Sequence, residues 1–436
     1  MKNLLKKVLS LLLVAIMVAG MIPLAVVGSA DDSTGSSYMR IFHLDCGRKY
    51  FTPKWVKALI VELSAAGYTH LELAVGNDGM RFILDDTSVT VGSTVYASQT
   101  VADAIKAGNK AYNGDESYWT EEDMDGIMAV AAARGIEIIP LINTPGHMDA
   151  ILDAGEAATG KTLSYNGSAR TIDVTNSAAT AFTKAFVVKY AQYFKNNGCK
   201  YINIGADEYA NDIYTGGSMG FGNLVSSGNY SSFVTYVNDL DNALKGIGLS
   251  TLMFNDGVYF NGNTSSGTFN TDITVCYWSS GWGGYQSATP ANLVQRGHSV
   301  INVNGDFYYV LGKDDAFTSG SSTTHNGDYS AAANFSNTEF MSASGINGVG
   351  SMFCVWCDYP NAETETEIAK NVRLLLRAMG ARMQDQTIDT ISTDDIKGGF
   401  AADGSIIPGD TVIRPTILTE GDTDKFYVGN SMSFYS

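Results

Sequence analysis

The sequence predicts an α/β fold, a (β/α)8 TIM barrel with a short C-terminal extension. Short apolar stretches with strand character alternate with amphipathic helical patterns, which indicates βα units around a parallel sheet. Eight such strand patterns follow one another, each with room for a helix behind it. The 436 residues also suit one barrel with a leader and a tail, since such barrels take roughly 250 residues and more with insertions.

The expected elements can be placed in order along the chain. Helices are expected over residues 54–66 and 363–379, after Ser177, and from Thr120, where Thr120 and Asp123 have the pattern of a reciprocal N-terminal cap. Strands are expected at residues 40–45, 70–75, 136–142, 201–204, 251–254, 273–278, 300–303 and 348–356.

The N-terminus has the pattern of an export signal. Lysines within the first seven residues precede an apolar run at 11–18, and small residues follow at 28–30. Residues 1–30 are therefore expected to be a signal peptide cleaved near Ala30, the alternative being an uncleaved membrane anchor. We expect a secreted or cell-surface protein with no membrane contact after cleavage.

The chain divides into three parts by composition. After the leader, residues 31–383 are expected to form the barrel domain. The segment 384–403 is rich in Asp, Thr and Gly, and short β-like pieces follow it. Residues 384–436 are therefore expected to be a linker with a partial β module or a tail. The sequence does not indicate whether the protein is a monomer or an oligomer.

Charge and cysteine content argue against several partners. The formal net charge of −17 disfavours nucleic acid and anionic membranes. Five widely spread cysteines do not suit a disulfide framework. Cys354 and Cys357 have zinc-knuckle spacing, but no second pair accompanies them, and residues three apart in a strand face opposite ways. We therefore predict buried thiols and no metal site.

Residues at the carboxyl ends of the eight strands form the candidate site. In a barrel of this kind these ends meet at one face, where active sites are built. Every end carries an aromatic, histidine or ionisable side chain of the kinds that a sugar site uses. They are Asp45, Arg48, Asn77, Asp78, the run 143–147, Asp207, Glu208, Asn255, Asp256, Trp278, Trp282, Tyr308, Tyr309, Trp356 and Asp358.

Asp207 and Glu208 are notable because they are adjacent. Retaining glycosidases usually hold their acid and nucleophile roughly 5–5.5 Å apart across the scissile bond. Neighbours in sequence cannot easily straddle a sugar ring, but they suit a reaction in which the 2-acetamido group of the substrate is the nucleophile. An isolated Asp-Glu pair could equally be a solvated turn. The strand-like residues 201–205 before it favour the catalytic interpretation.

Six motifs in order resemble glycoside hydrolase family 20, the β-N-acetylhexosaminidases. The branch that the chain resembles most is the streptococcal surface exo-β-N-acetylglucosaminidases, through residues 75–86, 143–152 and 208–212. The six motifs are Leu44-Asp-Cys-Gly-Arg48, Gly67-Tyr-Thr-His-Leu71, Ile138-Ile-Pro140, Pro145-Gly-His147, Gly205-Ala-Asp-Glu208 and Trp356-Cys-Asp358.

The resemblance implies the catalytic roles. Glu208 would be the general acid and then the base, a role that works best with a pKa raised towards neutrality. Asp207 would hold the acetamido group and balance the charge on the ring that this group forms. Tyr308 would donate to the acetamido oxygen, and Tyr309 is the weaker candidate because strand alternation places only one of them inward. No cofactor is implied, since the substrate supplies the nucleophile.

The resemblance also implies substrate-binding residues. Arg48 would grip the 3- and 4-hydroxyls of the terminal sugar, Asp358 would accept from the 4- and 6-hydroxyls, and His147 would support the acid. An ordinary salt-bridged arginine, a loop histidine and core tryptophans are the structural alternatives. The expected acetamido pocket is walled by Trp278, Trp282 and Trp356.

Two departures from the family pattern bear on these roles. Many members carry an acid where this chain has Asn143, which removes a charged partner for His147 and puts its role in doubt. The small β domain that often precedes the barrel is not seen before the first strand.

The resemblance favours a secreted exo-acting enzyme that releases terminal β-linked GlcNAc or GalNAc from glycans with retention. A lacto-N-biosidase that releases Gal-β1,3-GlcNAc is the alternative within the family. A non-catalytic glycan-binding protein is the alternative of another class, although the presence of both Asp207 and Glu208 argues against it.

Overall fold

The computed structural model describes residues 38–215, 218–262, 264–279, 288–303, 308–311, 339–340, 343–344, 346, 348–384, 398–400, 406–408, 413–415 and 426–428. The expected signal peptide and Trp282 lie outside these residues, and so does the side chain of Tyr308.

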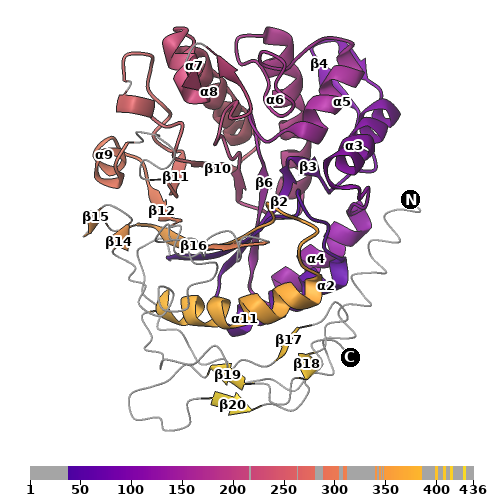
Figure 1. Ribbon diagram of the computed structural model, residues 1–436, viewed down its shortest axis with the longest axis vertical. Coiled ribbons are helices and arrows are strands. Elements are labelled where there is room, and N and C mark those ends of the chain that lie inside the picture. The colour runs from indigo at the N-terminus through magenta and orange to yellow at the C-terminus, as the bar shows by residue number, and fades with distance from the viewer. Residues whose placement is uncertain are drawn as a thin grey trace. The chain divides into compact units, whose positions relative to one another are not determined.

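Eight parallel strands close into a barrel surrounded by helices (Figure 1). Each strand pairs in parallel with the next, and the last pairs back with the first, so the predicted (β/α)8 barrel is confirmed. All eight predicted strands are present. They are β1 (Met39–Leu44), β2 (His70–Asn77), β6 (Glu137–Ile142), β7 (Tyr201–Asn203), β10 (Ser250–Phe254), β11 (Thr274–Tyr277), β12 (Val300–Asn302) and β16 (Gly350–Trp356).

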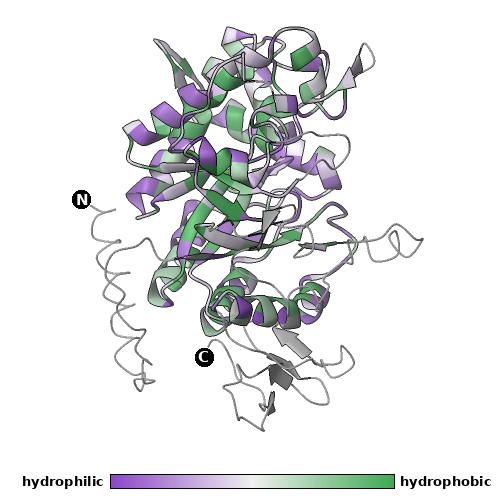
Figure 2. Ribbon diagram, turned by 90° about the vertical axis from the view of Figure 1, so that its left-hand side faces the viewer, coloured by the Kyte–Doolittle hydropathy of each residue, from purple (hydrophilic) through white to green (hydrophobic). Residues whose placement is uncertain are grey.

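Strand alternation divides the apolar side chains between two cores. In β1, Ile41 belongs to the cluster inside the barrel, whereas Phe42 belongs to the cluster between strands and helices. In the same way Cys354 faces inward and Cys357 outward, so these two residues do face opposite ways as predicted. Figure 2 shows hydrophobic residues concentrated on the strands, with hydrophilic residues on the outer faces of the helices.

Helix ends follow from capping chemistry. Thr52 accepts a hydrogen bond from the Trp55 amide, and Thr120 with Asp123 forms the expected reciprocal cap. Thr364 and Glu367 form a second such cap. The helices are α2 (Pro53–Ala65), α3 (Ser98–Asn113), α4 (Glu121–Ala133), α5 (Asp149–Thr159), α6 (Ser177–Asn196), α7 (Phe221–Ser226), α8 (Tyr230–Gly246), α9 (Pro290–Gln295) and α11 (Glu365–Arg382), with a 3-10 turn at Phe260–Gly262.

Short strands lie outside the main ring. β3 (Gly79–Met80) extends β2 in antiparallel fashion, and β13 (Tyr308–Val310) pairs in parallel with the end of β16. Small antiparallel pairs are formed by β4 and β5 (Val89–Val91, Thr94–Tyr96), β8 and β9 (Tyr214–Thr215, Ser218–Met219), β14 and β15 (Glu339–Phe340, Ala343–Ser344), β17 and β18 (Gly398–Phe400, Ile406–Pro408) and β19 and β20 (Ile413–Pro415, Phe426–Val428).

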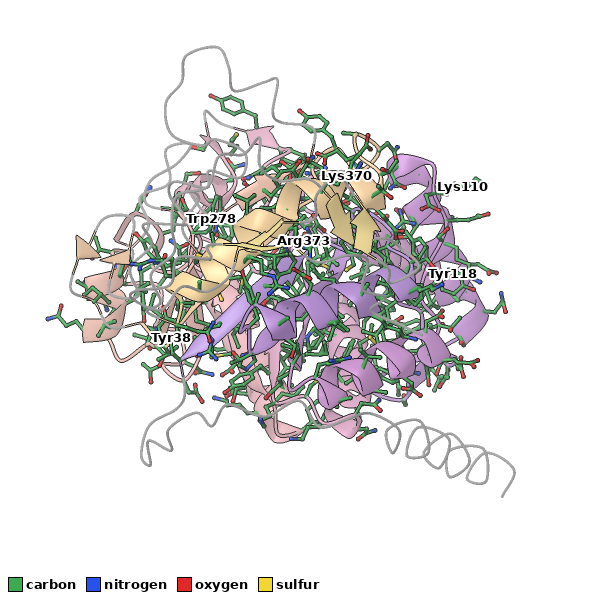
Figure 3. The ribbon with its side chains drawn as sticks, turned by 90° about the horizontal axis from the view of Figure 1, so that it is seen from below. Tyr38, Lys110, Tyr118, Trp278, Lys370 and Arg373 are labelled. Atoms are coloured by element: carbon green, nitrogen blue, oxygen red, sulfur yellow. The ribbon has the colours of Figure 1, made fainter. Side chains whose placement is uncertain are left out.

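A buried ion pair joins the first and last helices of the barrel. The fully buried Glu62 of α2 accepts from Arg373 Nε of α11 at 3.1 Å and also from Arg377. Burial would raise the pKa of Glu62, but the two arginines lower it to about 2. Arg373 is labelled on α11 in Figure 3. The seam between the two ends of the ring is thus held by charge as well as by the pairing of β1 with β16.

Cysteines, metals and membranes can be assessed for the described part of the chain. No helix there is long and apolar enough to cross a membrane. Within the same residues, no cluster of three or more His, Cys, Asp or Glu side chains could hold a metal ion. Free, buried thiols are found at Cys46, Cys199, Cys276, Cys354 and Cys357.

Candidate active site

Asp207 and Glu208 lie four and five residues past the end of β7, in a sharp turn. The backbone is left-handed at Gly205, Ala206 and Glu208, with φ values of 65°, 61° and 46°. A Cβ atom on Gly205 would lie 2.1 Å from Asn143 Oδ1, so only glycine fits this close approach. The turn places two neighbouring carboxylates at the carboxyl end of the barrel.

Asp207 is held by an amide from the neighbouring strand. Asn143, which follows β6, donates from Nδ2 to Asp207 Oδ1 at 2.8 Å, and its Oδ1 accepts from the Ala206 amide at 3.2 Å. Burial raises the pKa of Asp207 above its ordinary value, while the charge of His147 opposes the rise. The hydrogen bond from Asn143 favours the ionised form, which is the form that a charge-balancing role needs.

Glu208 is the more accessible of the two carboxylates. Its side chain is 23% exposed, and its Oε2 lies 3.2 Å from His147 Nε2. Burial tends to raise its pKa, but the hydrogen bond and charge of His147 outweigh burial and leave the pKa below its ordinary value. This differs from the raised pKa that suits a general acid. The cause is the imidazole of His147, whose own pKa is raised and whose charge favours the ionised carboxylate.

His147 connects Glu208 to a buried aspartate. Its Nδ1 lies 2.8 Å from Asp78 Oδ1, and each of these two side chains is only 3% exposed. Burial would lower the pKa of His147, but Asp78 and then Glu208 raise it well above its ordinary value. Asp78 therefore supplies the charged partner for the imidazole that Asn143 does not provide.

Arg48 lies among three carboxylates. Its Nε donates to Asp78 Oδ2 at 2.8 Å, and its Nη1 contacts Asp358 Oδ1 at 3.2 Å and Asp45 Oδ2 at 3.4 Å. Burial would lower its pKa, but Asp78 and Asp45 raise it well above its ordinary value. Its Nη2 also lies 3.3 Å from His147 Nδ1. Arg48 is thus salt-bridged, as the structural alternative held, but the bridges fix it within the same cluster as His147.

Two of the three candidate tryptophans lie among the described residues. Trp278 donates from its indole Nε1 to Asp256 Oδ1 at 3.3 Å, and it is labelled in Figure 3. The ring centroid of Trp356 lies 4.1 Å from that of His43, a buried residue inside the barrel. Both rings are partly exposed at strand ends, as a sugar platform requires. Trp282 lies outside the described residues.

The two adjacent tyrosines of β13 can be compared only in part. The Tyr309 hydroxyl donates to Glu363 Oε2 at 2.9 Å and accepts from Asn371 Nδ2 at 2.8 Å. Tyr309 is therefore engaged with residues at and before α11. Since the side chain of Tyr308 lies outside the described residues, its role stays a prediction.

A separate cavity of about 390 Å³ lies between α3, α5 and the loop that follows α5. Its lining includes Tyr112, Asp149, Asp153 and Glu156, but neither catalytic candidate. Burial and the charge of the nearby Asp78 raise the pKa of Asp149 to about 7. This acidic cavity is therefore distinct from the Asp207–Glu208 pair.

The chain belongs to glycosyl hydrolase family 20. The model of its catalytic domain matches residues 38–378, which is most of the chain and the whole described barrel. The chain accordingly contains the catalytic domain of a glycoside hydrolase of this family.

The chain is similar to a solved structure and to two curated proteins. A solved structure of StrH, a pneumococcal exo-β-D-N-acetylglucosaminidase, is 32% identical with a TM-score of 0.74, covering 83% of this chain and 85% of that chain. Lacto-N-biosidase of Bifidobacterium bifidum is 25% identical over 264 residues, 59% of this chain and 22% of that protein. β-Hexosaminidase of Vibrio vulnificus is 21% identical over 324 residues, 64% of this chain and 37% of that protein. The chain thus spans well under half the length of these two curated relatives.

The sequence indicated the residues of the site, but it did not reveal the contacts that two of them make. Asp78 and Asp256 were noted only as ionisable residues at strand ends. The structure shows Asp78 bonded to both His147 and Arg48, and Asp256 bonded to the Glu208 amide at 2.7 Å. The position of each aspartate one or two residues past a strand was the available signal.

Proposed function

We propose that this glycosidase removes single terminal β-linked N-acetylglucosamine or N-acetylgalactosamine units from glycans, with the acetamido oxygen of the substrate as nucleophile. The observation that carries the proposal is the adjacency of Asp207 and Glu208 at the end of one strand, each in a different environment. Such neighbours suit a reaction in which the enzyme supplies an acid and a polariser rather than its own nucleophile.

In the first step Glu208 protonates the glycosidic oxygen as the bond from C1 to that oxygen breaks. The acetamido oxygen attacks C1 and forms an oxazolinium ring, while Asp207 accepts from the acetamido nitrogen and balances its charge. His147 Nε2 lies 3.2 Å from Glu208 Oε2, so a protonated imidazole can supply the carboxylate with the proton for this step. Asp78 favours the protonated imidazole and so keeps that proton in the site.

In the second step the carboxylate of Glu208 takes a proton from water, which attacks C1 on the face left by the leaving group. The ring opens and the product keeps its β configuration. Tyr308 donates to the acetamido oxygen in this scheme, and Trp278 and Trp356 wall the pocket around the acetamido group and the apolar sugar face.

Arg48 and Asp358 would bind the hydroxyls of the terminal sugar far from the leaving group. Three ion pairs hold the Arg48 fork in place through Nε and Nη1, so Nη2, which none of them engages, is preorganised to donate to a hydroxyl oxygen. A fixed arginine at this place favours a pocket that closes around one sugar. This supports release of a monosaccharide, as does the likeness to StrH, an exo-β-D-N-acetylglucosaminidase.

Release of Gal-β1,3-GlcNAc is the second candidate, because one relative is a lacto-N-biosidase. That reaction needs room for galactose at the 3-hydroxyl, next to Arg48. The two candidates therefore differ in what the enzyme releases rather than in how it breaks the bond.

The test is hydrolysis of 4-nitrophenyl N-acetyl-β-glucosaminide and of the matching Gal-β1,3-GlcNAc glycoside. Turnover of the first, with a loss of about 10²–10⁴-fold in kcat for Glu208→Gln, would support the proposal. Glu122→Gln, an exposed change in the first turn of α4, is the matched control. Turnover of the second substrate alone would make the lacto-N-biosidase the function, and turnover of neither would refute both.

We also propose that the protein is exported and cleaved near Ala30. The support is the pattern of basic, apolar and small residues at the N-terminus. N-terminal sequencing of protein recovered from the culture medium tests this, since a start well before residue 31 would contradict it.

A further inference from the structure

The buried side chain of Asp256 lies between Glu208, the proposed acid, and Trp278, which is proposed to line the acetamido pocket. Asp256, two residues past β10, is fully buried and takes no part in the mechanism given above. Its Oδ2 accepts from the Glu208 amide at 2.7 Å, and its Oδ1 accepts from Trp278 Nε1 at 3.3 Å. One side chain therefore contacts two site residues that come from different strands.

The bond to Glu208 supports an unfavourable backbone conformation. Glu208 has a φ of 46°, in the left-handed region that is unfavourable for a residue other than glycine. The hydrogen bond from its amide to Asp256 offsets that cost. Because the direction of a side chain follows its backbone, this bond also determines where the Glu208 carboxylate points.

The bond to Trp278 sets the orientation of its ring. The neighbouring Asn255 accepts from the Trp278 amide at 2.8 Å and from the Ser279 amide at 3.1 Å, and it donates to the Ser279 carbonyl at 2.7 Å. Asn255 thus holds the backbone of Trp278, while Asp256 holds the indole. With both restrained, the ring has little freedom to rotate.

The charge of Asp256 is compatible with this position. Burial and the nearby Asp207 raise its pKa well above its ordinary value. A proton on Asp256 leaves oxygen lone pairs for both donors and avoids a third buried negative charge beside Asp207 and Glu208. The residue can therefore act as a structural acceptor without working against the ionised Asp207.

We propose that Asp256 is a positioning residue that holds the acid Glu208 and the wall Trp278 as one rigid unit. This inference rests on the roles proposed above for those two residues. It predicts that one substitution disturbs proton donation and acetamido binding together, although Asp256 contacts neither the substrate nor the reacting atoms.

Asp256→Asn is the informative change, because it keeps the volume but replaces one acceptor oxygen with a donor. Two substrates that differ only in the leaving group are compared: a 2,4-dinitrophenyl glycoside, which departs unprotonated, and a β-linked GlcNAc disaccharide, which needs the acid. We expect kcat to fall about 10²-fold on the disaccharide and less than tenfold on the aryl substrate. KM is expected to rise by a similar factor on both.

Control variants separate the two effects. Glu208→Gln should reproduce the dependence on the leaving group without the shared rise in KM, and Trp278→Phe should reproduce the rise without that dependence. Asp272→Asn, at an exposed aspartate paired with Lys245, should change neither. Equal losses on both substrates for Asp256→Asn, or no loss at all, would overturn the positioning role.

A measurement without turnover keeps this inference distinct from the proposed function. In protein labelled with 15N-tryptophan, the Trp278 indole signal is assigned by its absence in Trp278→Phe. We expect its indole proton to exchange with solvent at least about tenfold faster in Asp256→Ala, since this change removes both acceptor oxygens. An unchanged exchange rate would overturn the inference. Absence of turnover in the unsubstituted chain, by contrast, counts only against the proposed function.

Discussion

The substitution Asp78→Asn tests the chain of contacts from Asp78 through His147 to Glu208. The change keeps the shape of the side chain and removes the negative charge that lies 2.8 Å from His147 Nδ1. The proposed first step needs the proton that His147 and Glu208 share. Activity should therefore be lost as the pH rises through the pKa of this pair, and a lower pKa moves that loss to lower pH.

The magnitude follows from the geometry. Opposite unit charges 2.8 Å apart attract by at most about 6 kcal/mol at an effective dielectric constant of about 20. Each pKa unit corresponds to about 1.4 kcal/mol, and close opposite charges shift pKa values by about 1–3 units in practice. We therefore expect the alkaline limb of kcat/KM to move down by about 1–3 pH units, and kcat at its optimum to fall about 10²–10⁴-fold.

The assay is kcat/KM for 4-nitrophenyl N-acetyl-β-glucosaminide as a function of pH. Asp45→Asn is the matched control, because Asp45 pairs with Arg48 but has no direct bond to His147 among the described contacts. It should raise KM and leave the alkaline limb in place. Asp86→Asn, on the surface, controls for the loss of a carboxylate alone. An alkaline limb that stays in place in Asp78→Asn would refute the reasoning.

Three further predictions concern stability and reactivity. Asp149→Asn should stabilise the fold by roughly 1–3 kcal/mol at pH 8 and by little at pH 4, because the raised pKa of about 7 makes ionised Asp149 unfavourable as the pH rises. Equal denaturant midpoints for the variant and the unsubstituted protein at both pH values would contradict this. Glu62→Gln should lower the free energy of unfolding by about 3 kcal/mol near neutral pH, and this difference should shrink as the pH falls towards the Glu62 pKa of about 2. Urea unfolding measures the difference, with Glu122→Gln as the control. A thiol reagent should modify no cysteine in the native protein and all of them after unfolding, and fast labelling of the native protein would show that the burial is incomplete. The thiols are Cys46, Cys199, Cys276, Cys354 and Cys357.

The ring of strands could be predicted because each strand shows its pattern locally. In β1 and β16 the inward and outward side chains alternate, and loops with turn residues separate the strands. Helices α3 and α5 were not predicted. Their N-caps, Ala97 and Met148, make no side-chain hydrogen bond, so the usual signal of a helix start is missing.

The members of the site could be predicted, but their partners could not. Strand ends meet at one face of any such barrel, which brings Asp78, His147 and Glu208 together. Each of these residues has a left-handed backbone, with φ values of 56°, 51° and 46°. The alternation of side chains along a strand does not continue through such residues. The sequence therefore could not show which carboxylate bonds to the imidazole of His147, because this depends on turn geometry that no local pattern encodes.

The seam between α2 and α11 has a consequence for how the chain folds. The contact between Glu62 and Arg373 spans 311 positions, and β1 pairs with β16 over a similar distance. Contacts so far apart in sequence form late, since a long loop must close first. Until β16 is present, β1 has an unpaired edge, and until α11 is present, Glu62 cannot be buried without an uncompensated charge. A nascent chain that stops short of β16 should therefore stay open on that side and depend on chaperones or rapid completion to avoid association through the unpaired edge of β1.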